Sequence, residues 1–260
     1  MTRICFLNPF CGDRADSLIE ETVSPYLRNG TTVDVWHHKT GPDFPDYYVS
    51  KHLTEVEIMR SAVAAERAGY DAFVIGCSYD PGLTQCRELV NIPVVGPLES
   101  STALARSFGH RYSVLTDHHK AVPELEDRLR VYGTSANCRS VRAIDWFGSD
   151  MLLDLDAVAD DARAKADEVA ERDGAEAIIW GCTLIAAAYE RAVLQGRPET
   201  SQVAIINPNV VAVKVAEMFA DMQAVGQYRM SRKSYYQPQS HHDQESADQI
   251  AALLGVDPVI

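Results

Sequence analysis

Residues 72–78 read AFVIGCS and residues 177–183 read AIIWGCT, and these two matching stretches decide the fold. Each begins with a short apolar run, which is typical of a strand buried in a parallel sheet. Each run ends in Gly-Cys, followed by a hydroxyl residue and then by a helical pattern. Open α/β sheets bind ligands at the carboxyl ends of their strands, so we expect Cys77 and Cys182 at a ligand site.

Strand and helix patterns alternate along the rest of the chain, which predicts an α/β fold with parallel sheets. The order helix, Gly-Cys strand, helix, strand, helix occurs twice, with second strands at Ile92–Val95 and Val203–Ile206. We therefore predict two pseudo-symmetric, Rossmann-like halves with the site between them. The first half takes in residues 1–98 and 207–260, and the second residues 99–206.

The composition limits the class of function. Of the 260 residues, 46% are hydrophobic, which is enough for a core, and the formal net charge of −13 argues against nucleic acid or an anionic membrane surface as partner. No apolar run is long enough for a transmembrane helix, and the first residues do not resemble a signal peptide. We expect a cytoplasmic protein with reduced thiols that acts on a small molecule. The histidines come in doublets without metal-ligand spacing, so no metal site is predicted.

The two thiols could act as a base and an acid. A thiol has a pKa of about 8.5, and a helix N-terminus lowers it. Because a helical pattern follows both cysteines, we expect both pKa values to be lowered. Ser78 and Thr183 would cap the helices and hydrogen-bond a ligand. The alternative is that each cysteine is only a small buried hydrophobe, but the matched setting favours chemistry.

Other strand ends offer further candidates. Asn8 follows the first strand, where its amide could contact a ligand or only form a turn. Thr116 ends the strand 112–116, where it could contact a ligand or cap the next segment. The remaining cysteines are interpreted as structural (Cys5, Cys86, Cys138), and the role of Cys11 stays open.

Two segments carry less information. Residues 41–48 are rich in Pro, Asp and aromatic residues and predict a loop, either a lid or an ordinary surface connection. Residues from 223 onward form a tail that is expected to be disordered or to contact another subunit, with a short helix over 247–254.

Four segments resemble the aspartate/glutamate/hydantoin racemase superfamily, and within it the hydantoin and allantoin branch: GCSYDPGL at 76–83, PVVG at 93–96, YSVLT at 112–116 and DGAEAIIWGC at 173–182. The resemblance implies two α/β halves, no cofactor, and Cys77 and Cys182 as an acid/base pair. It implies that Asn8 contacts substrate. Asp80, in the segment that most resembles the hydantoin branch, is counted among the substrate-binding candidates.

The sequence departs from the family pattern at two places. Phe10-Cys11-Gly12 follows the Asn-Pro pair, and Thr183 follows the second cysteine as it does in amino-acid racemases, where the hydroxyl helps to bind a carboxylate. The predicted function is a racemase of a 5-substituted hydantoin or related ureide such as allantoin, acting as a homo-oligomer. The alternatives are an Asp/Glu-type amino-acid racemase, a maleate-type isomerase with a nucleophilic cysteine, and a non-enzymatic binding protein.

Overall fold

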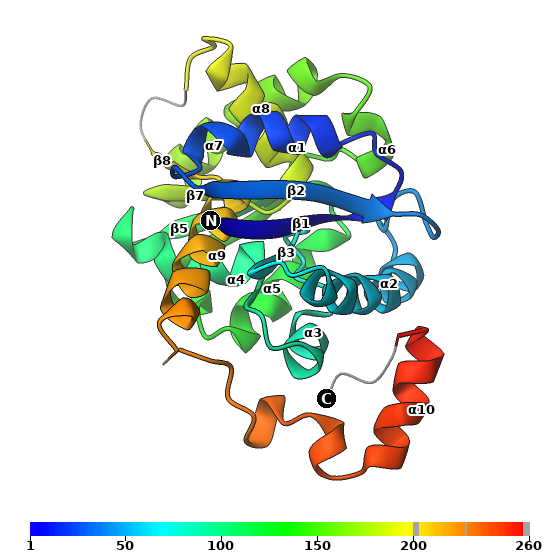
Figure 1. The fold of residues 1–260 in the computed structure, drawn as a ribbon. Helices are drawn as coiled ribbons and strands as arrows, with labels where there is room; N and C mark the ends of the chain where they lie inside the picture. Colours follow the sequence, from blue (N-terminus) through cyan, green and yellow to red (C-terminus); the bar gives the residue numbers. More distant parts are fainter. Residues whose placement is uncertain (200–202, 227, 257–260) are drawn as a thin grey trace.

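The computed structural model describes residues 1–199, 203–226 and 228–256 (Figure 1). It contains two four-stranded parallel sheets, as the sequence predicts. The first sheet has the order β2-β1-β3-β4, and the second has the order β6-β5-β7-β8. The strands are β1 (Thr2–Cys11), β2 (Thr31–His38), β3 (Ala72–Ile75), β4 (Val94–Val95), β5 (Tyr112–Thr116), β6 (Cys138–Ala143), β7 (Ala177–Trp180) and β8 (Ala204–Ile206).

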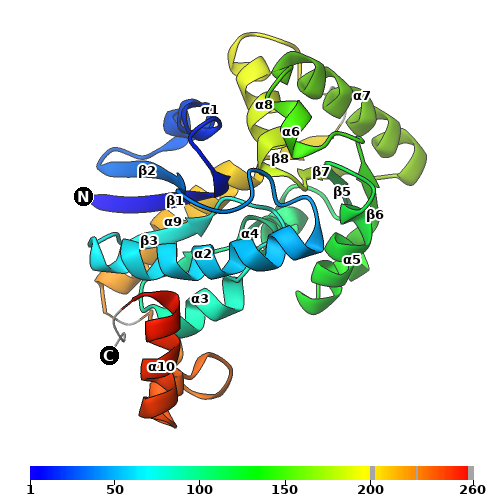
Figure 2. The ribbon, with the colours of Figure 1, turned by 90° about the vertical axis from the view of Figure 1, so that its right-hand side faces the viewer.

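Helices cover both faces of each sheet (Figure 2). Buried side chains of α1 and α9 pack on one face of the first sheet, and those of α2 and α3 on the other. In the second sheet, α7 and α8 cover one face and α4 and α5 the other. The helices are α1 (Asp16–Val23), α2 (Tyr48–Arg67), α3 (Leu83–Leu89), α4 (Pro97–Leu104), α5 (Ala121–Val131), α6 (Gly148–Met151), α7 (Leu155–Asp173), α8 (Thr183–Leu194), α9 (Pro208–Ala224) and α10 (Gln244–Leu254).

Each Gly-Cys pair sits where a strand passes close to its neighbour. A Cβ atom on Gly76 would lie 2.4 Å from the carbonyl oxygen of Leu7, and one on Gly181 would lie 2.7 Å from a methyl carbon of Val114. Only glycine fits at both places. The two strand ends are joined directly, because the Thr183 hydroxyl donates a hydrogen bond of 2.9 Å to the Gly76 carbonyl oxygen. The fold therefore brings the two cysteine-bearing turns together.

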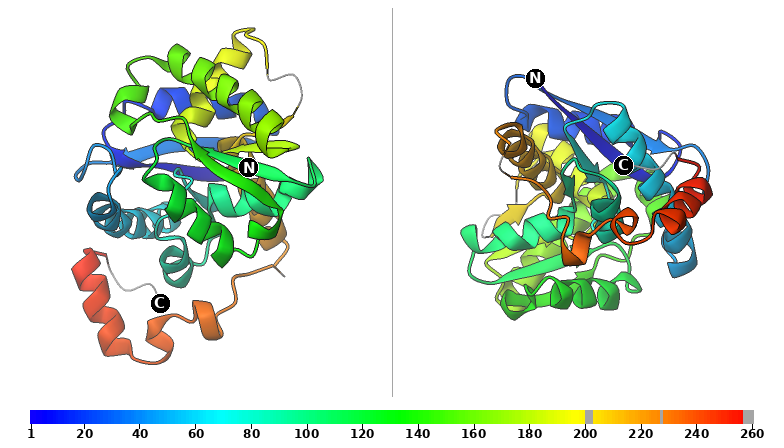
Figure 3. Two further views of the ribbon diagram at one scale, coloured as in Figure 1. Left: turned by 180° about the vertical axis from the view of Figure 1, so that it is seen from behind. Right: turned by 60° about the horizontal axis from the view of Figure 1, so that its bottom comes forward.

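The structure corrects several sequence-based expectations. Strand β6 was not predicted, and neither was the start of α2 at Tyr48. The expectation of disorder is wrong for the tail over residues 228–256, which lies along α2 and α3 (Figure 3). Arg232 donates to the backbone carbonyl oxygens of Arg87 and Val90, and Arg60 donates to that of Leu254. The exact boundary between the two halves stays a prediction.

Candidate functional site

Cys182 occupies the N-cap position of α8 and is only 8% exposed. The backbone N–H groups of Leu184 and Ile185 point toward the sulfur and act to lower the pKa of the thiol. Burial outweighs them, with a further contribution from the Asp117 carboxylate, so the pKa of Cys182 lies well above its usual range. The thiol is therefore neutral in the free protein at neutral pH.

Cys77 lies in a different local setting. Helix α3 begins only at Leu83, so the sulfur is not at a helix N-terminus. Burial raises the pKa of Cys77 to about 12, although the Tyr79 N–H and the Lys51 ammonium oppose the shift. The expectation that helix ends lower both pKa values is wrong, because loss of hydration disfavours the thiolate more than the nearby dipoles and charge favour it.

Tyr79 and Asp117 lie beside both thiols. The Tyr79 hydroxyl donates a hydrogen bond of 2.5 Å to Asp117 Oδ1. Burial, together with the charge of Asp117, keeps the pKa of Tyr79 well above its usual range. The Lys51 ammonium lies 3.5 Å from the centre of the Tyr79 ring and forms an ion pair with Glu124. The site thus contains a neutral phenol, a carboxylate and a paired cation around the two sulfurs.

Asn8 and Ser78 present polar atoms that the protein leaves unused. Asn8 Nδ2 donates 2.6 Å to Asp16 Oδ1, and because a carboxylate only accepts, the amide must turn its nitrogen to Asp16. Asn8 Oδ1 and Ser78 Oγ are buried without a hydrogen-bond partner among the described residues. Buried polar atoms normally have partners, so these two atoms are candidates for contact with a polar ligand.

The polar groups of the remaining predicted side chains form hydrogen bonds within the protein. The Thr183 hydroxyl donates to Gly76, and the Thr116 hydroxyl donates 2.8 Å to Asp117 Oδ1. Asp80 is fully buried and accepts hydrogen bonds from the first N–H groups of α4 and from the Tyr132 hydroxyl. The Asp80 carboxylate therefore holds the start of α4, and its contact with substrate stays a prediction.

An apolar wall completes the site. Phe10 and Cys182 belong to one buried apolar cluster, and Phe44 packs against it with its ring 5.6 Å from that of Phe10. The loop that carries Phe44 is attached at Cys11, whose N–H donates to the Pro42 carbonyl oxygen. This loop, residues 39–47, therefore lies over the cluster that holds the second thiol, as a lid would.

Comparison with known proteins adds independent information. The family profile described as Asp/Glu/hydantoin racemase matches residues 4–216. This chain belongs to the Asp/Glu/hydantoin racemase family. Among its family relatives, a hydantoin racemase from Pseudomonas sp. is 30% identical over 221 residues, which is 85% of this chain and 86% of the relative. A hydantoin racemase from Rhizobium meliloti is 38% identical over 158 residues, 58% of this chain and 61% of the relative.

A solved family structure resembles this one over nearly its whole length. The allantoin racemase from Pseudomonas fluorescens superposes with a TM-score of 0.79 at 25% sequence identity, covering 91% of this chain and 97% of that one. The matched family region contains β1 through most of α9 and both Gly-Cys turns. The tail after α9 lies outside it.

Sequence reasoning missed Tyr79 and Lys51. Tyr79 stands next to the first Gly-Cys-Ser turn, so its closeness to the site could have been inferred from position. Lys51 gave no signal, because it lies early in a helix whose start was not predicted, 26 residues before Cys77 in the chain. The ion pair with Glu124 of α5 and the contact with the Tyr79 ring hold its ammonium at the site.

Proposed function

We propose that this chain racemises a 5-substituted hydantoin or a related cyclic ureide such as allantoin, without a cofactor. The observation that carries the proposal is the pair of thiols on two matched strand ends, joined by the hydrogen bond from Thr183 to Gly76. The hydantoin racemases and the allantoin racemase to which the chain is similar support this substrate class.

In the proposed reaction, the thiolate of Cys77 or Cys182 removes the proton from the stereogenic carbon. The C–H electron pair moves onto the adjacent ring carbonyl and forms an enolate. The opposite thiol then donates its proton to the other face of the carbon and is left as the thiolate. A raised thiol pKa makes the thiolate a stronger base toward a weakly acidic carbon, but it also reduces the ionised fraction. Lys51 and the Tyr79 N–H act against that loss by favouring the Cys77 thiolate.

Two features favour a neutral ureide over a carboxylate substrate. The Thr183 hydroxyl gives its proton to Gly76 and cannot also donate to a carboxylate. Asn8 leaves its oxygen, not its nitrogen, without a hydrogen-bond partner among the described residues, and an oxygen can accept from a ring N–H. These features disfavour the amino-acid racemase and the diacid isomerase.

A proton-exchange experiment tests the mechanism. Each enantiomer of a 5-substituted hydantoin and of allantoin is incubated with the protein in heavy water, and exchange and optical rotation are followed together. We expect wild type to exchange and racemise, and Cys77→Ser and Cys182→Ser to lose racemisation by at least about 10³-fold while each still exchanges one enantiomer. Cys138→Ser is the matched control, since burial raises the pKa of Cys138 to about 12 as well.

Racemisation near the wild-type rate by either site variant would refute the two-thiol mechanism. Absence of exchange with all ureides, in a folded protein, would favour the non-enzymatic binding protein. Slow alkylation of Cys77 and Cys182 would not distinguish a racemase from a binding protein, because burial raises the pKa of both thiols whatever their role.

We propose further that the protein works as a homo-oligomer in the cytoplasm. A thiol-dependent mechanism needs a reducing compartment, and the six cysteines, all within the described residues, are free. Val49 and Leu53, in the first turns of α2, are 75% and 58% exposed, an apolar surface suited to a subunit contact. Light scattering after size exclusion measures the assembly. No helix within the described residues is long and apolar enough to cross a membrane.

A further inference from the structure

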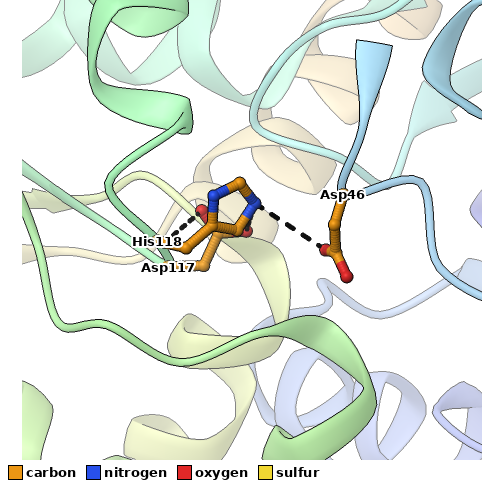
Figure 4. Close-up of side chains that lie close together, drawn as sticks. All are labelled: Asp46, Asp117 and His118. Carbon is orange, nitrogen blue, oxygen red and sulfur yellow. Dashed lines mark hydrogen bonds and ion pairs between the residues drawn. The ribbon is translucent and has the colours of Figure 1, made fainter. Parts of the chain in front are cut away.

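Three ionisable side chains that the proposed reaction does not require converge beside the site (Figure 4). Asp46 comes from the loop before α2, and Asp117 and His118 follow β5. His118 Nε2 lies 3.9 Å from an oxygen of Asp46 and 3.9 Å from Asp117 Oδ2. One atom from each of the three side chains lies within 4.8 Å of the other two. The Asp117 oxygen in this cluster is Oδ2, whereas the Tyr79 hydroxyl donates to Oδ1.

The state of His118 is independent evidence that this cluster binds a ligand. Its side chain is fully buried, and neither ring nitrogen has a hydrogen-bond partner in the part of the chain that is described. The ring stacks on Phe147, with centroids 4.7 Å apart and planes 10° apart, which fixes the direction of Nε2. A buried imidazole whose nitrogens have no hydrogen-bond partners carries a desolvation cost that lowers the stability of the folded protein. Something that binds Nε2 would remove that cost.

The spacing suits a metal ion better than a direct hydrogen bond. A distance of 3.9 Å is too long for a hydrogen bond between the imidazole and either carboxylate. Ligand bonds of about 2.0–2.2 Å in a tetrahedral arrangement place ligand atoms about 3.3–3.6 Å apart, so small rotations of the Asp46 and Asp117 side chains would bring all three ligand atoms into range. Two carboxylates and one neutral imidazole balance the charge of a divalent cation, and they suit Mn²⁺ or Zn²⁺.

We propose that Asp46, Asp117 and His118 form a binding site for a divalent transition-metal ion. The ion would join the loop 39–47 to the turn after β5 and so hold the lid over the apolar wall of the thiol site. In this role it is structural, and the proton transfer itself does not pass through it. The sequence predicts no metal here, because the three ligands come from two distant segments and His118 is hidden in a histidine doublet.

Mn²⁺ is the probe, because it prefers oxygen and nitrogen ligands and binds thiols weakly. Chelator-treated, full-length protein is titrated with MnCl₂ by calorimetry, and its thermal unfolding is followed with and without the metal. We expect about one Mn²⁺ per chain and a higher melting temperature when the metal is bound. His118→Gln and Asp46→Asn should each weaken binding by at least about 10-fold.

Two controls make the result specific. His119→Gln removes the neighbouring imidazole, which is exposed and lies 4.0 Å from Asp145, and this variant should bind Mn²⁺ as wild type does. Cys182→Ser should also retain binding, since the thiol is not a ligand. No binding at 1 mM Mn²⁺, binding unchanged in both His118→Gln and Asp46→Asn, or binding lost in Cys182→Ser would each overturn the proposal. The readouts do not depend on racemase activity, so they stand apart from the test of the proposed reaction.

Discussion

The raised pKa of Cys77 predicts how this thiol reacts with iodoacetamide as pH changes. Burial moves the pKa from 9.0 to about 12. At pH 8 the thiolate fraction is therefore about 10⁻⁴, against about 10⁻¹ for the unshifted thiol. A thiolate of higher pKa is intrinsically more nucleophilic, which returns a factor of roughly 15–30 over three pKa units. The net expectation is alkylation of Cys77 roughly 30–60-fold slower than in the unfolded chain.

The assay is mass spectrometry of the peptide that contains Cys77, after timed alkylation between pH 7 and pH 10. In the folded protein we expect the rate to rise about tenfold per pH unit without a plateau. In urea, the rate for the same peptide should level off between pH 9 and pH 10, because the unshifted pKa is 9.0. Restricted access of the reagent would lower all folded-state rates by one factor and keep the plateau, so the shape of the curve separates access from pKa. A plateau below pH 10 in the folded protein would refute the reasoning.

Two substitutions should move this curve in opposite directions. Asp117→Asn removes a negative charge that raises the pKa of Cys77, so alkylation at pH 8 should become faster. Lys51→Met removes the positive charge that lowers that pKa, so alkylation should become slower. The same direction of change in both variants would mean that packing, not charge, controls the thiol.

Two further outcomes are expected. Asp16→Ala frees the Asn8 amide to rotate, because it removes a hydrogen bond to a charged group that is worth about 1.5–3 kcal/mol. We expect KM for hydantoins, measured by polarimetry, to rise roughly 10–100-fold with kcat less affected. An unchanged KM would remove Asn8 from the substrate contacts. Gly76→Ala places a Cβ atom 2.4 Å from the carbonyl oxygen of Leu7. We expect this change to lower the free energy of unfolding, measured in urea, by about 3 kcal/mol or more. Wild-type stability would contradict the close approach of the two strands.

Sequence patterns were sufficient for the buried parts of the fold. The apolar runs before Cys77 and Cys182 predicted β3 and β7, because a strand buried on both faces needs apolar side chains throughout. Strand β6 was missed because its residues, Cys138–Ala143, include two arginines and a serine and are mostly not buried. Helix α2 begins without a side-chain cap at Tyr47, so nothing in the sequence marks its start.

The candidate site was predicted in position but not in its electrostatics. The place of both thiols followed from strand ends, a local property. Their pKa values depend on how much water the folded chain removes and on Asp117 and Lys51, which come from distant segments. The hydrogen bonds of Asp80 could not be predicted for the same reason, since the N–H groups that it binds lie 18 and 19 residues further along the chain.

The unequal surroundings of the two thiols have a thermodynamic consequence. Cys182 is buried at a helix N-cap, while Cys77 is partly exposed and lies near an ammonium group. The two enantiomers of a substrate with one stereocentre have equal free energy in water, so kcat/KM must be the same in both directions. The asymmetry of the protein can therefore appear only as a larger kcat for one enantiomer that is matched by a larger KM. The enantiomer that binds more weakly is then the one that turns over faster at saturation.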